Sequence, residues 1–195
     1  MATSRDFITI VSGIPRSGTS MMLRMLAAGG MEILTDGVRG ADADNPHGYF
    51  EWEPAKSLKR DTAWVAGAIG KGVKVIYYSL ADLPAGFRYR VIFMHRDLDE
   101  VLASQAAMLA RRGITGPAPD DATMKRLFED ELQEIAEWLA AQPAFAVLDV
   151  DYAAVRAAPL DEARRVNTFL GGDLDSAAMA GMVDPELYRR RGAGF

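Results

Sequence analysis

The sequence contains no cysteine and only two histidines, which lie far apart. The lack of cysteine excludes disulfides, thiolate metal sites and a cysteine nucleophile, and two distant histidines argue against a histidine-based metal site. No apolar run is long enough to cross a bilayer, and no signal peptide precedes the first apolar segment, which together predict a cytoplasmic protein without membrane contact. The net charge of −5 disfavours wholesale nucleic-acid binding.

The chain of 195 residues suits one compact domain, and we expect a single domain over residues 1–195. Apolar segments of strand length alternate along it with segments of helical periodicity. Strands are expected at 7–11, 31–34, 73–78, 89–95 and 145–150, and helices at 18–28, 56–69, 99–112, 122–141 and 160–170. This alternation predicts an α/β fold of three layers, a mostly parallel β-sheet flanked by helices, of the P-loop nucleotide-binding type.

The first expected strand leads through a short loop into a helix, over residues 7–26. A helix placed after such a loop points unsatisfied N–H groups and the positive end of its dipole at the loop, which favours a phosphate-like group there. The loop itself adds a guanidinium and several hydroxyl groups. The predicted anion-binding residues are Pro15, Arg16, Ser17, Gly18, Thr19 and Ser20.

The spacing of Gly13 and Gly18 is that of a nucleotide phosphate loop, but Thr19 stands where that loop has lysine. A nucleoside triphosphatase needs this lysine to neutralise its phosphates, whereas here Arg16 supplies a cation from within the loop. The sequence Pro-Arg-Ser-Gly-Thr-Ser resembles the 5′-phosphosulfate loop of sulfotransferases, which use 3′-phosphoadenosine 5′-phosphosulfate (PAPS). The resemblance implies PAPS as the cofactor, adenosine 3′,5′-bisphosphate as its product, and no metal.

A second motif combines an apolar strand with Arg96 and, eight residues later, Ser104. An arginine at the end of a strand and a hydroxyl in the next helix can both donate to one phosphate. Taken alone, Arg96 is explained equally well by ion pairing with Asp97 or Asp99, and Ser104 by close packing of its helix. The pair resembles the 3′-phosphate motif of sulfotransferases, which follows the phosphosulfate loop in the same order.

The resemblance covers most of the chain. Residues 151–172 are similar to the family's Tyr-x-x-Leu…Pro segment, and the sequence DNPHGYFE is similar to a stretch of bacterial members. The late Lys-x-Gly-x-x-Gly segment, which closes over the cofactor in the soluble cytosolic members, is absent. Arg111 and Arg112, or the arginines at 189–191, are candidates to replace it at the 3′-phosphate, although a terminal basic run is more often only solvated.

Sulfuryl transfer is an in-line displacement in which negative charge grows on the bridging oxygen of the leaving phosphate, as in phosphoryl transfer. Arg16 is the predicted stabiliser of this charge. The acceptor needs a base. Resemblance to the tyrosine- and carbohydrate-sulfating members indicates Asp36, which also fits a plain turn, and His47 and Glu51 remain alternatives. Lys74 resembles the lysine that some members direct at the bridging oxygen.

Two other functions are compatible with the sequence. A small P-loop kinase or nucleotidase is supported by the apolar segment 146–149, whose Asp149 would hold Mg²⁺, and is opposed by the missing loop lysine. A non-catalytic nucleotide-binding relative would keep the phosphate sites without a base. For a sulfotransferase the expected partner is a small-molecule hydroxyl or amine acceptor, and no motif indicates which acceptor it is or whether the chain forms oligomers.

Overall fold

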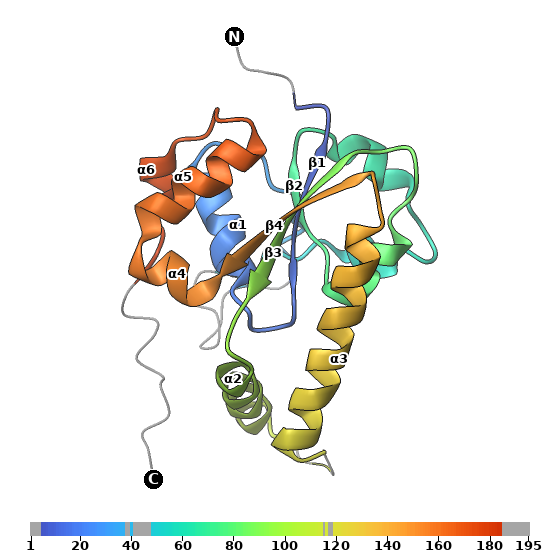
Figure 1. Ribbon diagram of the computed structural model, residues 1–195, viewed down its shortest axis with the longest axis vertical. Coiled ribbons are helices and arrows are strands. Elements are labelled where there is room, and N and C mark those ends of the chain that lie inside the picture. Colours follow the sequence, from blue (N-terminus) through green and yellow to red (C-terminus); the bar gives the residue numbers. More distant parts are fainter. Residues whose placement is uncertain (1–4, 38–39, 41–47, 115, 117–118, 185–195) are drawn as a thin grey trace.

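The computed structural model describes residues 5–37, 40, 48–114, 116 and 119–184. Its middle layer is a four-stranded, all-parallel sheet in the order β2-β1-β3-β4 (Figure 1). The strands are β1 (Ile8–Gly13), β2 (Gly72–Lys74), β3 (Tyr89–His95) and β4 (Phe145–Asp151). Helices flank both faces of this sheet, which confirms the predicted three-layer α/β fold.

Alternate residues of the central strand face two separate hydrophobic cores. Ile10 packs into one core together with residues of α2 (Leu98–Arg111) and α3 (Asp121–Ala140) and of three short 3₁₀ helices, Glu53–Ser57, Ala63–Ala68 and Tyr77–Asp82. Val11 packs into the other, with residues of α1 (Thr19–Ala28), α4 (Tyr152–Ala157), α5 (Pro159–Leu170) and α6 (Ser176–Ala180). This alternation is the period of two that a strand buried on both faces requires.

The expected strand at 31–34 is reduced to a single bridge between Ile33 and Gly72. Leu34 still donates its backbone N–H to the Gly72 carbonyl at 2.8 Å, but Thr35 and Asp36 then turn away to bond with the backbone of residues 51 and 53. The prediction of a full strand was therefore wrong, because these local polar bonds end the pairing with β2.

The expected helix at 56–69 is also absent, and two of the 3₁₀ helices occupy this region instead. The side chain of Asp61 accepts the backbone N–H of Ala63 at 2.8 Å, a turn that competes with continuous helix. The expected strand at 73–78 likewise ends at Lys74, and a 3₁₀ helix begins at Tyr77.

The other expected helices agree with the structure to within a few residues, whereas the short helix α4 was not predicted. Asp97 caps α2, because its carboxylate accepts the backbone N–H of Glu100 at 3.0 Å. Asp99 forms an ion pair with Lys125 of α3 at 2.9 Å. No helix in the described ranges combines the length and apolar character that a bilayer-spanning segment needs.

The strand order reverses between β1 and β3, because the chain runs from β1 out to β2 and then returns across β1 to β3. In open parallel sheets, ligands bind in the crevice outside the carboxyl ends of the strands at such a reversal. The loop after β1 and the residue after β3 both lie at this edge. The fold therefore brings the two predicted phosphate motifs to one place.

The buried phenol of Tyr89 makes the fold sensitive to alkaline pH. Its hydroxyl donates to the Pro84 carbonyl at 2.7 Å, and burial raises the pKa of Tyr89 to about 12 from an ordinary 10.0. The unfolded chain therefore loses this proton first, so the stabilisation is complete below pH 10 and is lost as the pH rises toward 12. Tyr77, which donates to Glu131, has a raised pKa for the same main reason and acts in the same direction.

We expect urea denaturation to show the free energy of unfolding falling by about 1.4 kcal/mol per pH unit for each such tyrosine above pH 10. Tyr89→Phe should make this slope shallower. Equal slopes in the wild type and in Tyr89→Phe would contradict the assignment.

Candidate anion-binding site

The loop between β1 and α1 is built as a cradle of backbone groups. Ser17 donates its N–H to the Ile14 carbonyl at 3.1 Å, and Met22 donates to the Gly18 carbonyl at 3.1 Å, as in the first turn of a helix. No side chain caps α1 at Gly18, so the first N–H groups of the helix point toward the loop. Arg16 has a φ of 79°, a conformation that is uncommon for residues other than glycine and is kept mainly at functional sites.

Two glycines fit this loop because no side chain has room at their positions. A Cβ on Gly13 would lie 2.6 Å from the Met94 carbonyl oxygen, and a Cβ on Gly18 would lie 2.6 Å from Cδ2 of Tyr152. Both glycines also have positive φ values, 140° and 104°. The glycine spacing in the sequence thus reflects the close approach of β3 and α4 to the loop backbone.

The two predicted phosphate motifs touch in the structure. Nε of Arg16 donates to Oγ of Ser104 at 2.9 Å, across 88 positions of sequence. A terminal guanidinium nitrogen of Arg96 donates to the main-chain carbonyl of Arg16 at 3.0 Å. We call Arg16, Arg96 and Ser104 the arginine cluster, and it joins β1, β3 and α2 beside the uncapped start of α1.

Arg96 does not form either of the ion pairs that the sequence suggested, since Asp97 caps α2 and Asp99 pairs with α3. Its Nε instead donates to a carboxylate oxygen of Glu100 at 3.1 Å. Its guanidinium also lies 4.5 Å from the ring centroid of Tyr152. Carbonyl, carboxylate and ring therefore fix Arg96 from three sides.

A second group of donors lies at the first turn of α1. Nζ of Lys74 donates to the Tyr49 carbonyl at 3.1 Å and to Oγ of Ser20 at 3.3 Å, and Oγ of Ser20 donates to the same carbonyl at 3.2 Å. Tyr49 is buried, and Phe50 beside it has a positive φ of 50°. The structure thus places Lys74 beside the first turn of α1 and holds the chain at Tyr49 against it.

The three candidate bases differ in their surroundings. Oδ2 of Asp36 accepts the backbone N–H of Glu53 at 2.6 Å, so this carboxylate also has a local structural role. Glu51 pairs with Lys56 at 2.6 Å. Desolvation lowers the pKa of Lys56, but bonds to Glu51 and Glu53 outweigh it and raise that pKa overall. His47 lies outside the described residues.

Arg111 ends α2 and Arg112 follows it, so both lie at the opposite end of this helix from Arg96, and their role at the 3′-phosphate stays a prediction. Both are exposed, and α2 has 14 residues, so its ends are roughly 20 Å apart. Arg96 stands directly before the start of this helix. The other candidates, the arginines at 189–191, lie outside the described residues.

Asp149, the residue that would hold Mg²⁺ in a kinase, is largely exposed, and its carboxylate accepts a hydrogen bond from Nε2 of His95 at 2.7 Å. Within the ranges that the structure describes, no group of three or more histidine, aspartate or glutamate side chains is arranged to hold a metal ion.

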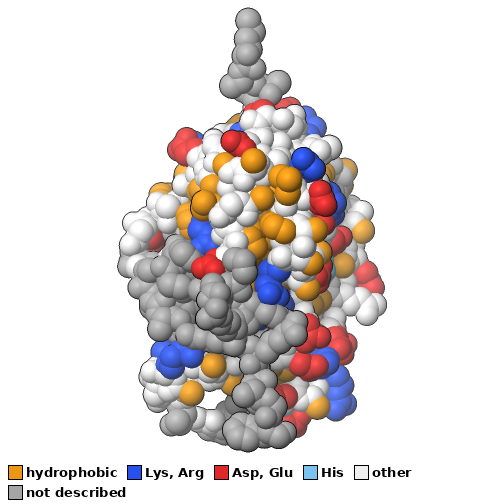
Figure 2. Space-filling view, turned by 90° about the vertical axis from the view of Figure 1, so that its left-hand side faces the viewer, with side chains coloured by type: hydrophobic (Ala, Val, Ile, Leu, Met, Phe, Trp, Pro, Cys, Tyr) orange, Lys and Arg blue, Asp and Glu red, His pale blue; other side chains and the backbone are white. Residues whose placement is uncertain are grey.

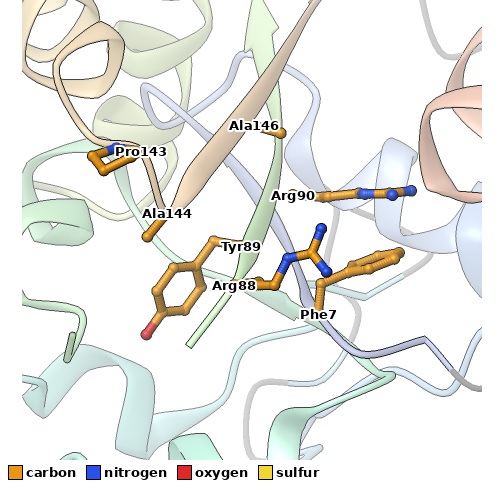
Figure 3. A pocket seen from close by; sticks show the side chains of 7 residues that line it. All are labelled: Phe7, Arg88, Tyr89, Arg90, Pro143, Ala144 and Ala146. Atoms are coloured by element: carbon orange, nitrogen blue, oxygen red, sulfur yellow. The ribbon is translucent and has the colours of Figure 1, made fainter. Parts of the chain in front are cut away.

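A small hollow lies at the opposite, amino-terminal edge of the sheet. Figure 3 shows Phe7, Arg88 and Arg90 on one side of it and Pro143 and Ala144 on the other. Its volume is about 80 Å³, whereas sites for small organic molecules usually measure about 300 Å³ or more. This hollow is therefore too small for a nucleotide and lies away from both phosphate motifs.

The residues at the loop meet the requirements of a phosphate-bearing ligand. Ser17 is fully buried, and its hydroxyl has no hydrogen-bond partner in the described part of the chain. Thr9 and Ser12 in β1 have buried hydroxyls without partners in this part of the chain as well, so the donors that bear on a phosphate are the arginine cluster and the first N–H groups of α1. On the side of the molecule seen in Figure 2, Lys and Arg side chains are interspersed with Asp and Glu, so positive charge there is local rather than spread over a broad patch.

Sequence reasoning missed two participants, the Tyr49 carbonyl and the Tyr152 ring. Tyr152 directly follows β4 and the capping residue Asp151, which places it at the carboxyl edge of the sheet. This place directly after a strand could have been used to predict Tyr152. No pattern in the sequence predicts a contact made by the main-chain carbonyl of Tyr49. In comparisons with known proteins, the chain matches no protein-family model and no curated protein.

Proposed function

We propose that this chain is a PAPS-dependent sulfotransferase of the P-loop type, acting in the cytoplasm on a small-molecule hydroxyl or amine. The observation that carries the proposal is the arginine cluster beside the uncapped start of α1. It offers two guanidinium groups, a hydroxyl and backbone N–H groups at the edge of the sheet where ligands bind. Such donors suit a nucleotide with phosphate groups at two positions.

Bound PAPS would supply a sulfuryl group, which passes to the acceptor oxygen or nitrogen while the bond from sulfur to its bridging phosphate oxygen breaks. The electron pair of that bond stays on the leaving phosphate. Arg16 and Lys74 would stabilise the charge that develops there, since fixed donors at such a position are often the largest catalytic contribution. Asp36 would receive the proton of the acceptor.

Incubation of the protein with PAPS labelled with radioactive sulfur tests this proposal. Alcohols, phenols, sugars and amines serve as a panel of acceptors. We expect label to move to at least one class of acceptor, with adenosine 3′,5′-bisphosphate released in equal amount. Binding of that bisphosphate without any transfer would favour a non-catalytic relative instead.

Asp36→Asn tests the assignment of the base. An asparagine oxygen can still accept the Glu53 N–H, so we expect the melting temperature to stay nearly unchanged. Turnover should fall by about 10²- to 10⁴-fold, because the amide takes no proton. The matched variant is Glu51→Gln, which removes the charge partner of Lys56. If Glu51→Gln lost the turnover and Asp36→Asn kept it, the two roles would be exchanged.

A kinase or nucleotidase is the second candidate, and Asp149 at the end of β4 is the observation in its favour. Thr19 in the position of the phosphate-loop lysine opposes it. The side chain of Asp149 is also engaged with His95. Titration of adenosine 3′,5′-bisphosphate without metal against ATP with Mg²⁺ separates the two functions.

A further inference from the structure

Tyr152 joins the phosphate loop to Arg96 through two different parts of its ring. The edge of the ring abuts the loop, because a Cβ on Gly18 would lie 2.6 Å from Cδ2 and 3.2 Å from Cε2. The ring centroid lies 4.5 Å from the Arg96 guanidinium carbon. The side chain is half-buried, so this contact is partly removed from water. A cation over an aromatic ring at this distance is attracted by the ring's electron-rich face.

The position of Tyr152 is itself well fixed by the fold. It is the first residue of α4 and follows β4 without a loop. Asp151 caps this helix by accepting the Ala154 N–H at 2.9 Å. The backbone of Tyr152 is therefore fixed by a strand before it and a capped helix after it.

Arg96 contacts α2 and the loop at the same time, through different nitrogens of its guanidinium. Glu100 lies on α2 and draws the guanidinium toward that helix through a 3.1 Å ion pair. The bond to the Arg16 carbonyl draws it toward the loop. Both bonds are made in one orientation, and the ring, which also touches the loop at Gly18, adds a contact that ties the guanidinium to the loop.

We infer that Tyr152 is a positioning residue, which holds Arg96 over the phosphate loop and so sets the preference of the site for a nucleotide with a second, ribose-linked phosphate. The inference rests on the proposed function, in which Arg96 meets that phosphate. Arg156 lies 5.9 Å from the same ring centroid, a weaker contact at the limit of such attractions.

Calorimetric titration of two nucleotides, adenosine 3′,5′-bisphosphate and adenosine 5′-monophosphate, tests this role. We expect Tyr152→Leu to weaken the bisphosphate by about tenfold and the monophosphate by about twofold at most, since cation–ring contacts are of this order. Tyr152→Phe keeps the ring face and should bind like the wild type. Equal losses for both nucleotides would mean that Tyr152 only supports the loop, which overturns the inference.

A double-mutant cycle with Arg96→Gln shows whether the effect passes through Arg96. In the Arg96→Gln background, Tyr152→Leu should cause no further loss of bisphosphate affinity. A full further loss would overturn the inference. The control cycle pairs Tyr152→Leu with Arg156→Gln, where the two losses should simply add.

Ring fluorination provides a test that leaves packing intact. Phenylalanine with increasing numbers of fluorine atoms, placed at position 152, weakens the ring face without changing its shape, and bisphosphate affinity should fall stepwise. If the wild type bound neither nucleotide, the proposed function would fail, and the same series would then be titrated with inorganic phosphate. Stepwise loss of phosphate affinity would still support the positioning role, whereas absent or unchanged phosphate binding would overturn it.

Discussion

Arg16→Ala is expected to lower the turnover of sulfuryl transfer by about 10²- to 10³-fold, the usual effect of removing one donor that stabilises transition-state charge. Affinity for adenosine 3′,5′-bisphosphate should fall far less, because backbone N–H groups at α1 and the Arg96 side chain remain. The structure explains why turnover should fall more than nucleotide affinity. The carbonyl of Arg16, which Arg96 contacts, is kept in any substitution, and only the guanidinium is lost.

Arg16→Gly is the matched variant for this experiment, because glycine adopts a φ of 79° without strain. If the guanidinium is what matters, Arg16→Gly and Arg16→Ala lose turnover equally, even though the glycine variant has the more relaxed backbone. Single-turnover kinetics and calorimetry together measure the two effects. Near-normal turnover in either variant would remove Arg16 from the catalytic role.

Lys74→Met is expected to lower turnover by about 10²-fold, since an ammonium group directed at the leaving oxygen is lost while the length of the side chain is kept. Its position at the first turn of α1, bonded to Ser20 and to the Tyr49 carbonyl, is the basis for this prediction. The same bonds also hold the chain around Tyr49. A structural effect must therefore be separated from a catalytic one.

Two further variants make that separation. Ser20→Ala removes a hydroxyl from the same contact without removing the charge, and because Ser20 is itself a predicted anion-binding residue, the two variants are compared by melting temperature rather than by turnover. Lys71→Met changes a lysine of the neighbouring segment that pairs with exposed Glu32, and it should leave turnover unchanged. If Lys74→Met kept its turnover and only lowered the melting temperature, as Ser20→Ala would, Lys74 would only hold the chain.

The sequence predicted the secondary structure well wherever apolar residues recur at the spacing of a strand or of a helix. The run after Asp6 became β1 and the methionine-rich segment became α1, whose Met22 and Met25 are fully buried. Predictions failed where short polar contacts decide the backbone, as at Asp61, whose side chain begins a turn. A periodic pattern carries no information about such a bond.

The candidate site was predictable residue by residue but not as an assembly. The sequence motifs identified Arg16, Arg96, Ser104 and Lys74, yet they suggested two separate clusters. In the structure Arg16 contacts Ser104 across 88 positions, a distance in sequence that only the sheet order bridges. Asp36 likewise accepts a hydrogen bond from the backbone N–H of Glu53, 17 positions later in the sequence. The motifs did not predict this contact either, because it depends on how the chain folds between the two residues.

The most direct test of the central claim is calorimetry of the wild-type protein with two nucleotides. Adenosine 3′,5′-bisphosphate is titrated without metal, and ATP is titrated with Mg²⁺. The account predicts a clear binding isotherm for the bisphosphate and little or no heat from the triphosphate, because the loop has Thr19 in place of lysine. Heat from Mg²⁺–ATP together with none from the bisphosphate would contradict it.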